Sequence, residues 1–257
     1  MWKLNYTTKK PALNKPVLIE GLPGIGNVGK LALDFIIDET KAKKIAEFHS
    51  YGFPHSVFVN EENLVELPAI EVFAKQRKGK PDLLLLAGDV QPLDEQSCYQ
   101  FSDTVLEMAK DLGCSEIITL GGIAMKQVPK IPQVFLTGNS REIVKKYKKS
   151  TQLNNNLYGT VGPIVGVSGV LLGLAKRKNI GAVSLLAETY GHPMYLGIAG
   201  AREIIKVLNS KLSLNLRMKQ LEKELSELEQ EMAENPSLKQ VKSLAKLRKP
   251  KDTSYIG

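Results

Sequence analysis

Short apolar runs alternate with longer stretches of helical periodicity over the first 210 residues of the chain. Runs rich in Leu, Ile and Val predict strands, and apolar positions three and four residues apart predict helices. The expected strands cover residues 17–19, 44–51, 70–74, 83–87, 116–120, 133–137 and 182–187, and the expected helices cover 28–38, 97–112, 140–149, 163–178 and 196–208. Because strands alternate with helices, the pattern predicts an α/β fold, a three-layer sandwich with a mostly parallel sheet between helices.

Polar and glycine-rich interruptions predict how these elements are joined. Two short apolar runs at 57–59 and 64–67 flank a polar tetrapeptide and predict a hairpin. Gly121-Gly122 predicts a turn, and Glu188–Pro193 predicts a loop at the carboxyl end of a strand. Pro163 is expected in the first turn of the helix that follows it.

The C-terminal segment has a different periodicity. Apolar residues spaced 4, 3, 4, 3 and 4 apart are Leu214, Met218, Leu221, Leu225, Leu228 and Met232. This heptad stripe predicts a coiled-coil helix over 211–234 that joins copies of the chain. After Asn235-Pro236, a short helix over about 237–248 is expected to carry Leu238, Val241, Leu244 and Leu247 on one face. The predicted organisation is therefore an α/β domain (1–210), a coiled-coil helix (211–234) and a tail (235–257).

Of the net charge of +8, the tail carries +5, residues 211–234 carry −2 and residues 1–210 carry the remaining +5. Residues 235–257 carry six Lys or Arg and one Asp, whereas residues 211–234 carry four Lys or Arg and six Glu. A basic tail without a continuous basic surface does not favour nucleic-acid binding. The longest apolar run, 161–175, is too short to span a bilayer, and the first residues lack a secretory signal. We therefore expect a cytoplasmic protein without membrane contact.

The glycine turn at 21–29 is the most conspicuous candidate site. Gly24, Gly26 and Gly29 match G-x-G-x-x-G, and Gly24, Gly29 and Lys30 nearly match a P-loop. However, Leu31 stands where the P-loop hydroxyl should bind magnesium, and no acidic residue closes the second predicted strand. Such glycines also serve tight helix–sheet packing. Nucleotide binding, or a ligase-like enzyme using the Gly24–Gly29 turn, therefore stays the alternative interpretation.

Other candidate chemistry is sparse. Ser168 lacks the G-x-S-x-G spacing of a nucleophile elbow. The cysteines, Cys98 and Cys114, and the three histidines have no metal-ligand spacing, so neither a metal nor a cofactor is expected. Asp89, Glu188 and His192 stand near predicted strand ends, where α/β proteins place ligands, and they support one enzyme hypothesis.

Five segments together resemble the proteasome assembly chaperone family, in particular its archaeal branch. They are EGLPGIGNVG (20–29), NEENLVELP (60–68), LLLLAGDVQP (83–92), GPIVGVSGVLLGLAKRKNI (162–180) and LLAETYGHP (185–193). The resemblance implies a phosphorylase-like α/β sandwich without catalytic residues that acts as a scaffold for proteasome α-subunits. It also implies a tail ending in hydrophobic-Tyr-any residue, which docks between α-subunits. Here the chain ends Ser254-Tyr255-Ile256-Gly257, so the Tyr is third from last.

The sequence is therefore interpreted as a non-enzymatic, homo-oligomeric chaperone or adaptor for proteasome α-subunits or the core particle. Partner binding is assigned to the apolar tail face, with Tyr255 as the anchor, Ile256 beside it and the Gly257 carboxylate as the charged contact. Self-association is assigned to the heptad stripe. A structural coiled-coil adaptor without a proteasome link is a third interpretation.

Overall fold

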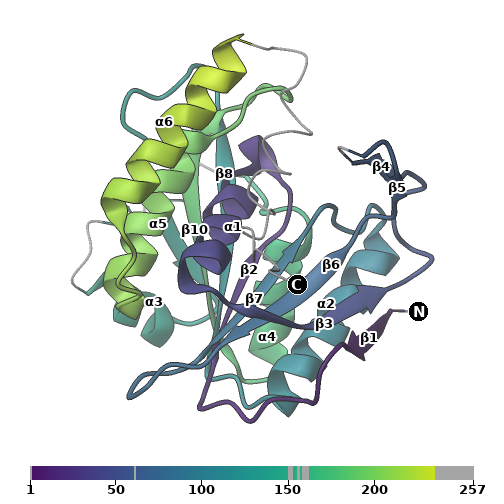
Figure 1. The fold of residues 1–257 in the computed structure, drawn as a ribbon. Helices are drawn as coiled ribbons and strands as arrows, with labels where there is room; N and C mark the ends of the chain where they lie inside the picture. The colour runs from purple at the N-terminus through teal and green to yellow at the C-terminus, as the bar shows by residue number, and fades with distance from the viewer. Residues whose placement is uncertain (1, 61, 150–152, 155–156, 158–161, 235–257) are drawn as a thin grey trace, which may run out of the picture.

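Figure 1 shows the fold in a computed structural model of the chain. The structure describes residues 2–60, 62–149, 153–154, 157 and 162–234. The predicted tail helix and its Leu238, Val241, Leu244 and Leu247 lie outside the described residues, as do Tyr255, Ile256 and Gly257. The tail assignments therefore stay predictions.

One mixed sheet forms the centre of the molecule. Its strand order is β1-β3-β6-β7-β2-β8-β10-β9. These strands are β1 (Lys3–Tyr6), β3 (Lys43–His49), β6 (Ile70–Lys75), β7 (Leu83–Gly88), β2 (Val17–Gly21), β8 (Glu116–Met125), β10 (Gly181–Tyr190) and β9 (Val134–Gly138). The central neighbours β7, β2, β8 and β10 are parallel, whereas β1, β3, β6 and β9 pair antiparallel with their neighbours. The separate hairpin consists of β4 (Phe58–Val59) and β5 (Val65–Glu66), as the sequence predicts.

Helices cover both faces of this sheet. One face lies against α1 (Val28–Thr40), α3 (Arg141–Lys148), α5 (Ile198–Leu212) and α6 (Met218–Glu234), and the other against α2 (Glu95–Asp111) and α4 (Val167–Arg177). Successive residues of a strand point to opposite faces, so Leu83 and Leu85 pack on the first layer and Leu84 and Leu86 on the second. The three-layer α/β sandwich predicted from the sequence is confirmed.

Two predicted loops are in fact strand. β8 continues through Gly121-Gly122, and β10 continues through Glu188–Tyr190, because the two strands stay paired to Tyr190↔Met125. A Cβ at Gly122 would lie 2.3 Å from the carbonyl oxygen of Ile25. The glycine therefore serves the close approach of a neighbouring loop rather than a turn, and the prediction of a turn was wrong.

The start of the predicted helix 163–178 was also wrong. α4 begins at Val167. The preceding Gly166 has φ +84° and ψ −165°, and these dihedral angles do not occur inside an α-helix. The side chain of Gln91 replaces a local cap: the Val167 amide donates to Gln91 Oε1 at 3.2 Å. A long-range contact therefore sets this helix start, and Pro163 lies outside the helix.

The sequence interpretation missed β1. Its short alternation places Trp2 and Leu4 on the face that packs against α2, where the Trp2 ring lies 4.7 Å from that of Phe101 and 5.1 Å from that of Phe53. Three alternating apolar positions next to the chain start are a weak signal. The contacts of Trp2 with Phe53 and Phe101 hold the start of this edge strand against the body, and β1 pairs with β3.

The first part of the heptad stripe packs on the chain itself. α6 lies alongside α5 (Figure 1), and Leu221 and Leu225 belong to the same apolar core as α1 and α5. The predicted helix over 211–234 is wrong at its start: α6 begins at Met218, because Ser213 and Asn215 have positive φ, and Leu214 lies in the connection from α5. Leu221 is fully buried, and Leu214 and Met218 are partly buried against the core. For Leu228 and Met232 only the helical backbone is described. Self-association through the stripe stays a prediction, but Leu221 and Leu225 already have partners within their own chain.

Candidate functional site

The carboxyl ends of the central parallel strands form one edge of the sheet, here called the carboxyl edge. Its loops contact one another closely. Gln91 Nε2, after β7, donates to the Pro23 carbonyl at 2.7 Å, and the Gly197 amide, after β10, donates to the Gly26 carbonyl at 2.7 Å. The glycine turn that follows β2 therefore lies at the centre of the edge where α/β proteins bind ligands.

Its glycines are used for packing. Gly26 has φ +61°, and a Cβ there would lie 2.7 Å from Thr189 Oγ1. A Cβ on Gly29 would lie 2.5 Å from the Leu120 carbonyl oxygen, whereas Gly24 faces open space. The turn, with its 3-10 helix η1 (Ile25–Asn27), is thus pressed onto β8 and β10. This arrangement accounts for Gly26 and Gly29 without a bound phosphate.

The P-loop interpretation also requires a lysine that reaches the phosphates. Lys30 instead is fully buried, and its Nζ lies 2.8 Å from Asp34 Oδ2 one turn further along α1. Leu31 is buried in the core as well. The lysine is therefore committed to an intrahelical ion pair, and the geometry does not favour a nucleotide at this turn.

The three strand-end candidates do not form one site. Asp89 Oδ2 accepts the Ala69 amide at 3.1 Å and so joins β7 to β6. Glu188 Oε2 accepts the Gln133 amide at 2.9 Å at the start of β9. His192 stacks on Tyr190 with ring centroids 5.9 Å apart. Because β2 and β8 separate β7 from β10, the two carboxylates are too far apart to act on one atom.

The sequence interpretation did not single out Glu20, which is the most perturbed carboxyl of this edge. Its Oε1 accepts the Leu22 amide at 3.0 Å, and its Oε2 accepts the Ser168 hydroxyl at 2.8 Å. Burial raises the pKa of Glu20 to about 7, although both hydrogen bonds act to lower it. The sequence signal that could have identified Glu20 is its position as a single glutamate in the apolar run of β2. Since Ser168 pairs with a carboxyl group and not with a histidine, the arrangement is a buried structural link.

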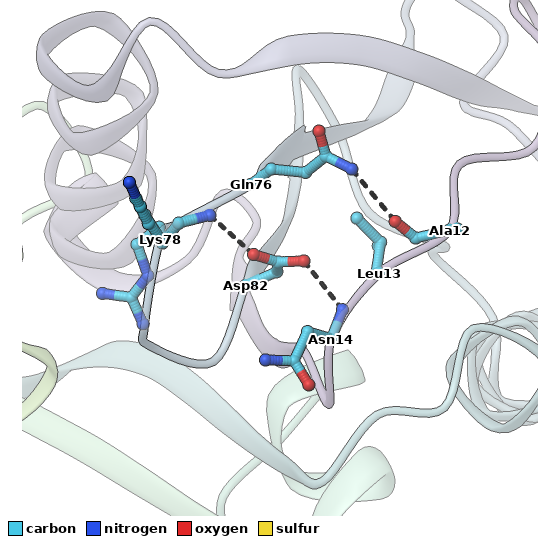
Figure 2. A pocket seen from close by; sticks show the side chains of 7 residues that line it. Ala12, Leu13, Asn14, Gln76, Lys78 and Asp82 are labelled. Carbon is cyan, nitrogen blue, oxygen red and sulfur yellow. Dashed lines mark hydrogen bonds between the residues drawn. The ribbon is translucent and has the colours of Figure 1, made fainter.

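One pocket lies at the opposite edge, among the loops that precede β2 and β7 (Figure 2). It has a volume of about 560 Å³, and Asp82 is one of the residues that line it. The Asp82 carboxylate accepts the Asn14 amide at 2.8 Å and the Arg77 amide at 2.6 Å, and Gln76 Nε2 donates to the Ala12 carbonyl at 3.0 Å. These bonds hold two loops together, so the Asp82 carboxylate and the Gln76 amide group already have structural partners.

A second pocket of about 320 Å³ lies between α1 and β6. The side chain of Lys44 lines this pocket, and its Nζ lies 2.8 Å from Glu71 Oε1 and 2.6 Å from Glu47 Oε2. Within the described ranges no cluster of three or more His, Cys, Asp or Glu could hold a metal ion. In the same ranges, no helix is both long enough and apolar enough to cross a bilayer.

Comparison with known proteins gives the family. A profile of the PAC2 family matches residues 18–235. An uncharacterised protein of Methanocaldococcus jannaschii is 29% identical over 249 residues, which cover 95% of this chain and 93% of the relative. The crystal structure of Pyrococcus furiosus PbaB, an archaeal proteasome activator, is similar with a TM-score of 0.81 and 29% identity, over 91% of this chain and 98% of that chain.

A second solved structure agrees with this. Pyrococcus furiosus PbaA, an archaeal homologue of proteasome-assembly chaperone, matches with a TM-score of 0.72 over 90% of each chain, and at 24% identity it shows the fold alone. The resemblance to proteasome assembly chaperones drawn from the five sequence segments is confirmed. Because the PAC2 profile matches most of the α/β body and α6, this chain belongs to the PAC2 family.

Proposed function

We propose that this chain is a non-enzymatic, cytoplasmic chaperone or adaptor that binds proteasome α-subunits, alone or in the core particle. The observation that carries the proposal is the likeness to PbaB, an archaeal proteasome activator, at 29% identity over nearly the whole of both chains. A fold alone would not support a function, but shared identity over the full length makes a shared partner class a reasonable inference.

The site geometry is consistent with a binding role. At the carboxyl edge, Glu20, Asp89 and Glu188 each hold a backbone amide of the chain itself. Lys30 is paired with Asp34 in the core. Groups arranged in this way position loops, and the Ser168 hydroxyl, which donates to Glu20 Oε2 at 2.8 Å, belongs to the same set of structural contacts.

The position of α6 supports a role for the tail. Because β10 runs toward the carboxyl edge, α5 returns from it, and α6 packed alongside α5 runs toward it again (Figure 1). The segment after Glu234 therefore starts from a helix whose early turns are fixed to the body. We propose that this tail contacts the α-subunits, with Tyr255 as the anchor and Ile256 and the Gly257 carboxylate beside it. The predicted apolar face of Leu238, Val241, Leu244 and Leu247 would add contact area.

Surface plasmon resonance on immobilised archaeal proteasome α-subunits tests the proposal. Full-length protein is expected to bind, and a chain ending at Glu234 is expected to bind at least tenfold more weakly. Tyr255→Ala should weaken binding to a similar degree, because it removes the anchor, whereas the neighbouring Ser254→Ala serves as a matched control and should not. Loss on truncation alone would assign the contact to the leucine face. Undiminished binding by the truncated chain would contradict the role of the tail.

A further inference from the structure

We propose that the amino edge of the sheet, where the central parallel strands begin, binds the phosphate backbone of double-stranded nucleic acid. This inference goes beyond proteasome binding and does not depend on it. It rests on the exposed cations that the fold gathers at this edge, on the contacts that join them into one face, and on the absence of exposed apolar side chains from the described part of the same edge.

Exposed cations are concentrated at the amino edge. The segments that meet there are 7–16, 38–43, 76–82, 107–116, 139–149, 176–180 and 211–217, each of them described in full. We call their exposed Lys and Arg side chains the basic face: Lys9, Lys10, Lys15, Lys41, Lys43, Lys78, Lys110, Arg141, Lys145, Lys146, Lys148, Lys149, Lys176, Arg177, Lys178 and Arg217. The exposed carboxylates of the same segments are Asp38, Glu107, Asp111 and Glu142. Cations therefore exceed carboxylates sixteen to four.

The opposite edge has the opposite balance. Carboxylates outnumber the Lys and Arg side chains that are exposed in the described loops of the carboxyl edge. The carboxylates are Glu62, Glu66, Asp94 and Glu95, and the cations are Lys126 and Lys130. The charge of the body is thus polarised along the strands. A face of one sign of charge attracts and orients a partner of the other sign, so the amino edge suits a polyanion.

Hydrogen bonds between distant segments make the basic face continuous. At one layer of helices, Ser115 Oγ donates to the Lys15 carbonyl at 3.1 Å, which joins the end of α2 to the loop before β2. Near the other end of the edge, Asn139 Nδ2 donates to the Ile180 carbonyl at 2.8 Å and joins the start of α3 to the end of α4. The cations of these segments therefore lie on adjoining loops.

The second layer of helices closes the same face. Lys80 Nζ donates to the Ser213 carbonyl at 2.9 Å, and Lys211 Nζ donates to the Lys149 carbonyl. These bonds hold the loop between β6 and β7, the end of α5 and the end of α3 together, beside the start of α6 (Figure 1). Both helix layers therefore contribute to one basic surface.

The width of this surface fits a duplex. Adjacent strands lie about 4.8 Å apart, so the eight strands of the main sheet extend over roughly 34 Å. The basic face follows this edge from Lys43 at the start of β3 to α3 beside β9. One helical turn of a duplex is also about 34 Å long. The cations are therefore spread over a length that brings successive phosphates of one turn within reach.

The amino edge lacks the apolar centre that a protein or membrane partner would bury. In the described part of the chain, large exposed hydrophobic side chains lie in the loops of the carboxyl edge, in the β4–β5 hairpin and at the start of α2. Protein interfaces have an apolar core, and membrane-bound surfaces insert apolar side chains. Protein–nucleic acid interfaces are more polar and much more positively charged. The composition of the basic face therefore favours nucleic acid.

The same observation favours a duplex over a single strand. The large aromatic side chains exposed in the described residues are Tyr51, Phe58 and Tyr99, and none of them belongs to the segments of the amino edge. Single-strand binding proteins stack bases on exposed aromatic rings. A surface of cations without such rings contacts phosphates, which a duplex presents on its outside.

In the sequence these cations are dispersed. They belong to segments that are far apart along the chain, and the expectation against nucleic-acid binding was based on the absence of a continuous basic surface. The fold assembles such a surface at the amino edge, away from the basic tail. Its contacts are to the backbone, so binding without sequence preference is expected.

Fluorescence anisotropy of the full chain with labelled RNA and DNA duplexes of two helical turns tests this inference. Micromolar affinity is expected at about 50 mM salt, with a loss of about a thousandfold at about 200 mM, as about six phosphate contacts produce. Similar affinities for the two duplexes would support contact with the shared backbone, and a preference would identify RNA or DNA as the source of the phosphates.

Charge reversal at the two edges gives the matched comparison. Lys145→Glu with Lys176→Glu should weaken binding at least tenfold and lower the salt slope by about 2, because two phosphate contacts are lost. Lys126→Glu with Lys130→Glu changes the net charge equally at the carboxyl edge, and should change affinity less than threefold and leave the slope unchanged. All four side chains are exposed. Thermal midpoints monitor folding, and Lys145→Gln with Lys176→Gln replaces the first pair if charge reversal prevents folding.

Three further arms separate the other partners and the tail. A chain ending at Glu234 should keep the salt slope, and neither poly-glutamate nor phosphatidylserine vesicles should compete as well as the duplex at equal charge. No salt-sensitive binding, equal losses in the two charge-reversal pairs, or a loss on truncation alone would overturn the proposal. Full competition by poly-glutamate or by the vesicles would do so too, since the partner would then be an acidic protein or a membrane. Binding to α-subunits is measured separately, so its failure would leave this result intact.

Discussion

Gly122→Ala is expected to lower the free energy of unfolding by about 3 kcal/mol, the upper part of the usual range for overpacking. The new methyl group would lie 2.3 Å from the Ile25 carbonyl oxygen and 2.9 Å from Thr189 Cγ2. The first neighbour is backbone of the glycine turn, so relief requires η1 to move off β8. For a domain of this size, the thermal midpoint should fall by roughly 6–12 °C.

Gly121→Ala is the matched control, one residue earlier in β8. A methyl group there meets only Leu186 Cδ2 at 3.0 Å, the mobile end of a side chain. We expect a change below about 1 kcal/mol, since strand propensity offsets a small adjustment. Chemical denaturation followed by circular dichroism measures both variants. Equal effects would contradict the view that the glycine turn is held by close packing on β8.

Glu20→Gln is expected to remove most of the pH dependence of stability between about pH 4.5 and 8. Burial raises the pKa of Glu20 from its ordinary 4.5 to about 7, so the folded chain holds a proton that the unfolded chain has released. Stability therefore falls as pH rises through this window and is lowest above pH 7. The difference amounts to roughly 3 kcal/mol at 1.36 kcal/mol per pKa unit.

The glutamine keeps an oxygen for the Leu22 amide and an amide group that the Ser168 hydroxyl can accept from, and it carries no charge to bury. The variant should match the parent chain near pH 4.5 and exceed its stability at pH 8. Glu107→Gln, on the exposed face of α2, is the control and should follow the parent chain. Denaturation midpoints across this pH range give the comparison. Parallel curves for parent and Glu20→Gln would show that Glu20 is ionised without cost.

The sequence predicts the centre of this fold well and its edges less well. The apolar runs of β2, β7, β8 and β10 are buried on both faces, and such runs are a strong signal of central parallel strands. β1 depends on an aromatic pocket formed by Phe53 and Phe101, which are distant in sequence. The local sequence pattern around β1 cannot show that two distant phenylalanines form a pocket beside it.

The errors at Gly121-Gly122 and Pro163 have a common cause. In each case a local turn or helix signal is overridden by a contact from another loop: Ile25 against Gly122, and Gln91 against Gly166 and Val167. The heptad stripe shows a related ambiguity. Its spacing places Met218, Leu221 and Leu225 on one face of α6 that packs on the core, whereas Leu214 precedes the helix. Spacing alone does not distinguish a second copy from the chain's own core as the partner.

The glycine turn shows how far a short motif can be taken. Gly24, Gly26 and Gly29 satisfy a dinucleotide-binding pattern, and the sequence opposes nucleotide binding through Leu31 at the P-loop hydroxyl position and through the lack of an acidic residue at the end of the second strand. The decisive observations are tertiary: Lys30 is buried with Asp34, and Gly29 packs on Leu120. By contrast, five weak segments spread over the chain identified the family, because their combined spacing is more specific than any one of them.

Native mass spectrometry of the full chain mixed with purified archaeal proteasome α-subunits tests the central claim most directly. It reports the mass of any complex, whichever surface of the chain makes the contact. The account predicts species that contain both proteins, in fixed ratios, at low micromolar concentration and physiological ionic strength. If the chain and the α-subunits, each folded, appear only as separate species under these conditions, the assignment as a proteasome-binding protein is contradicted.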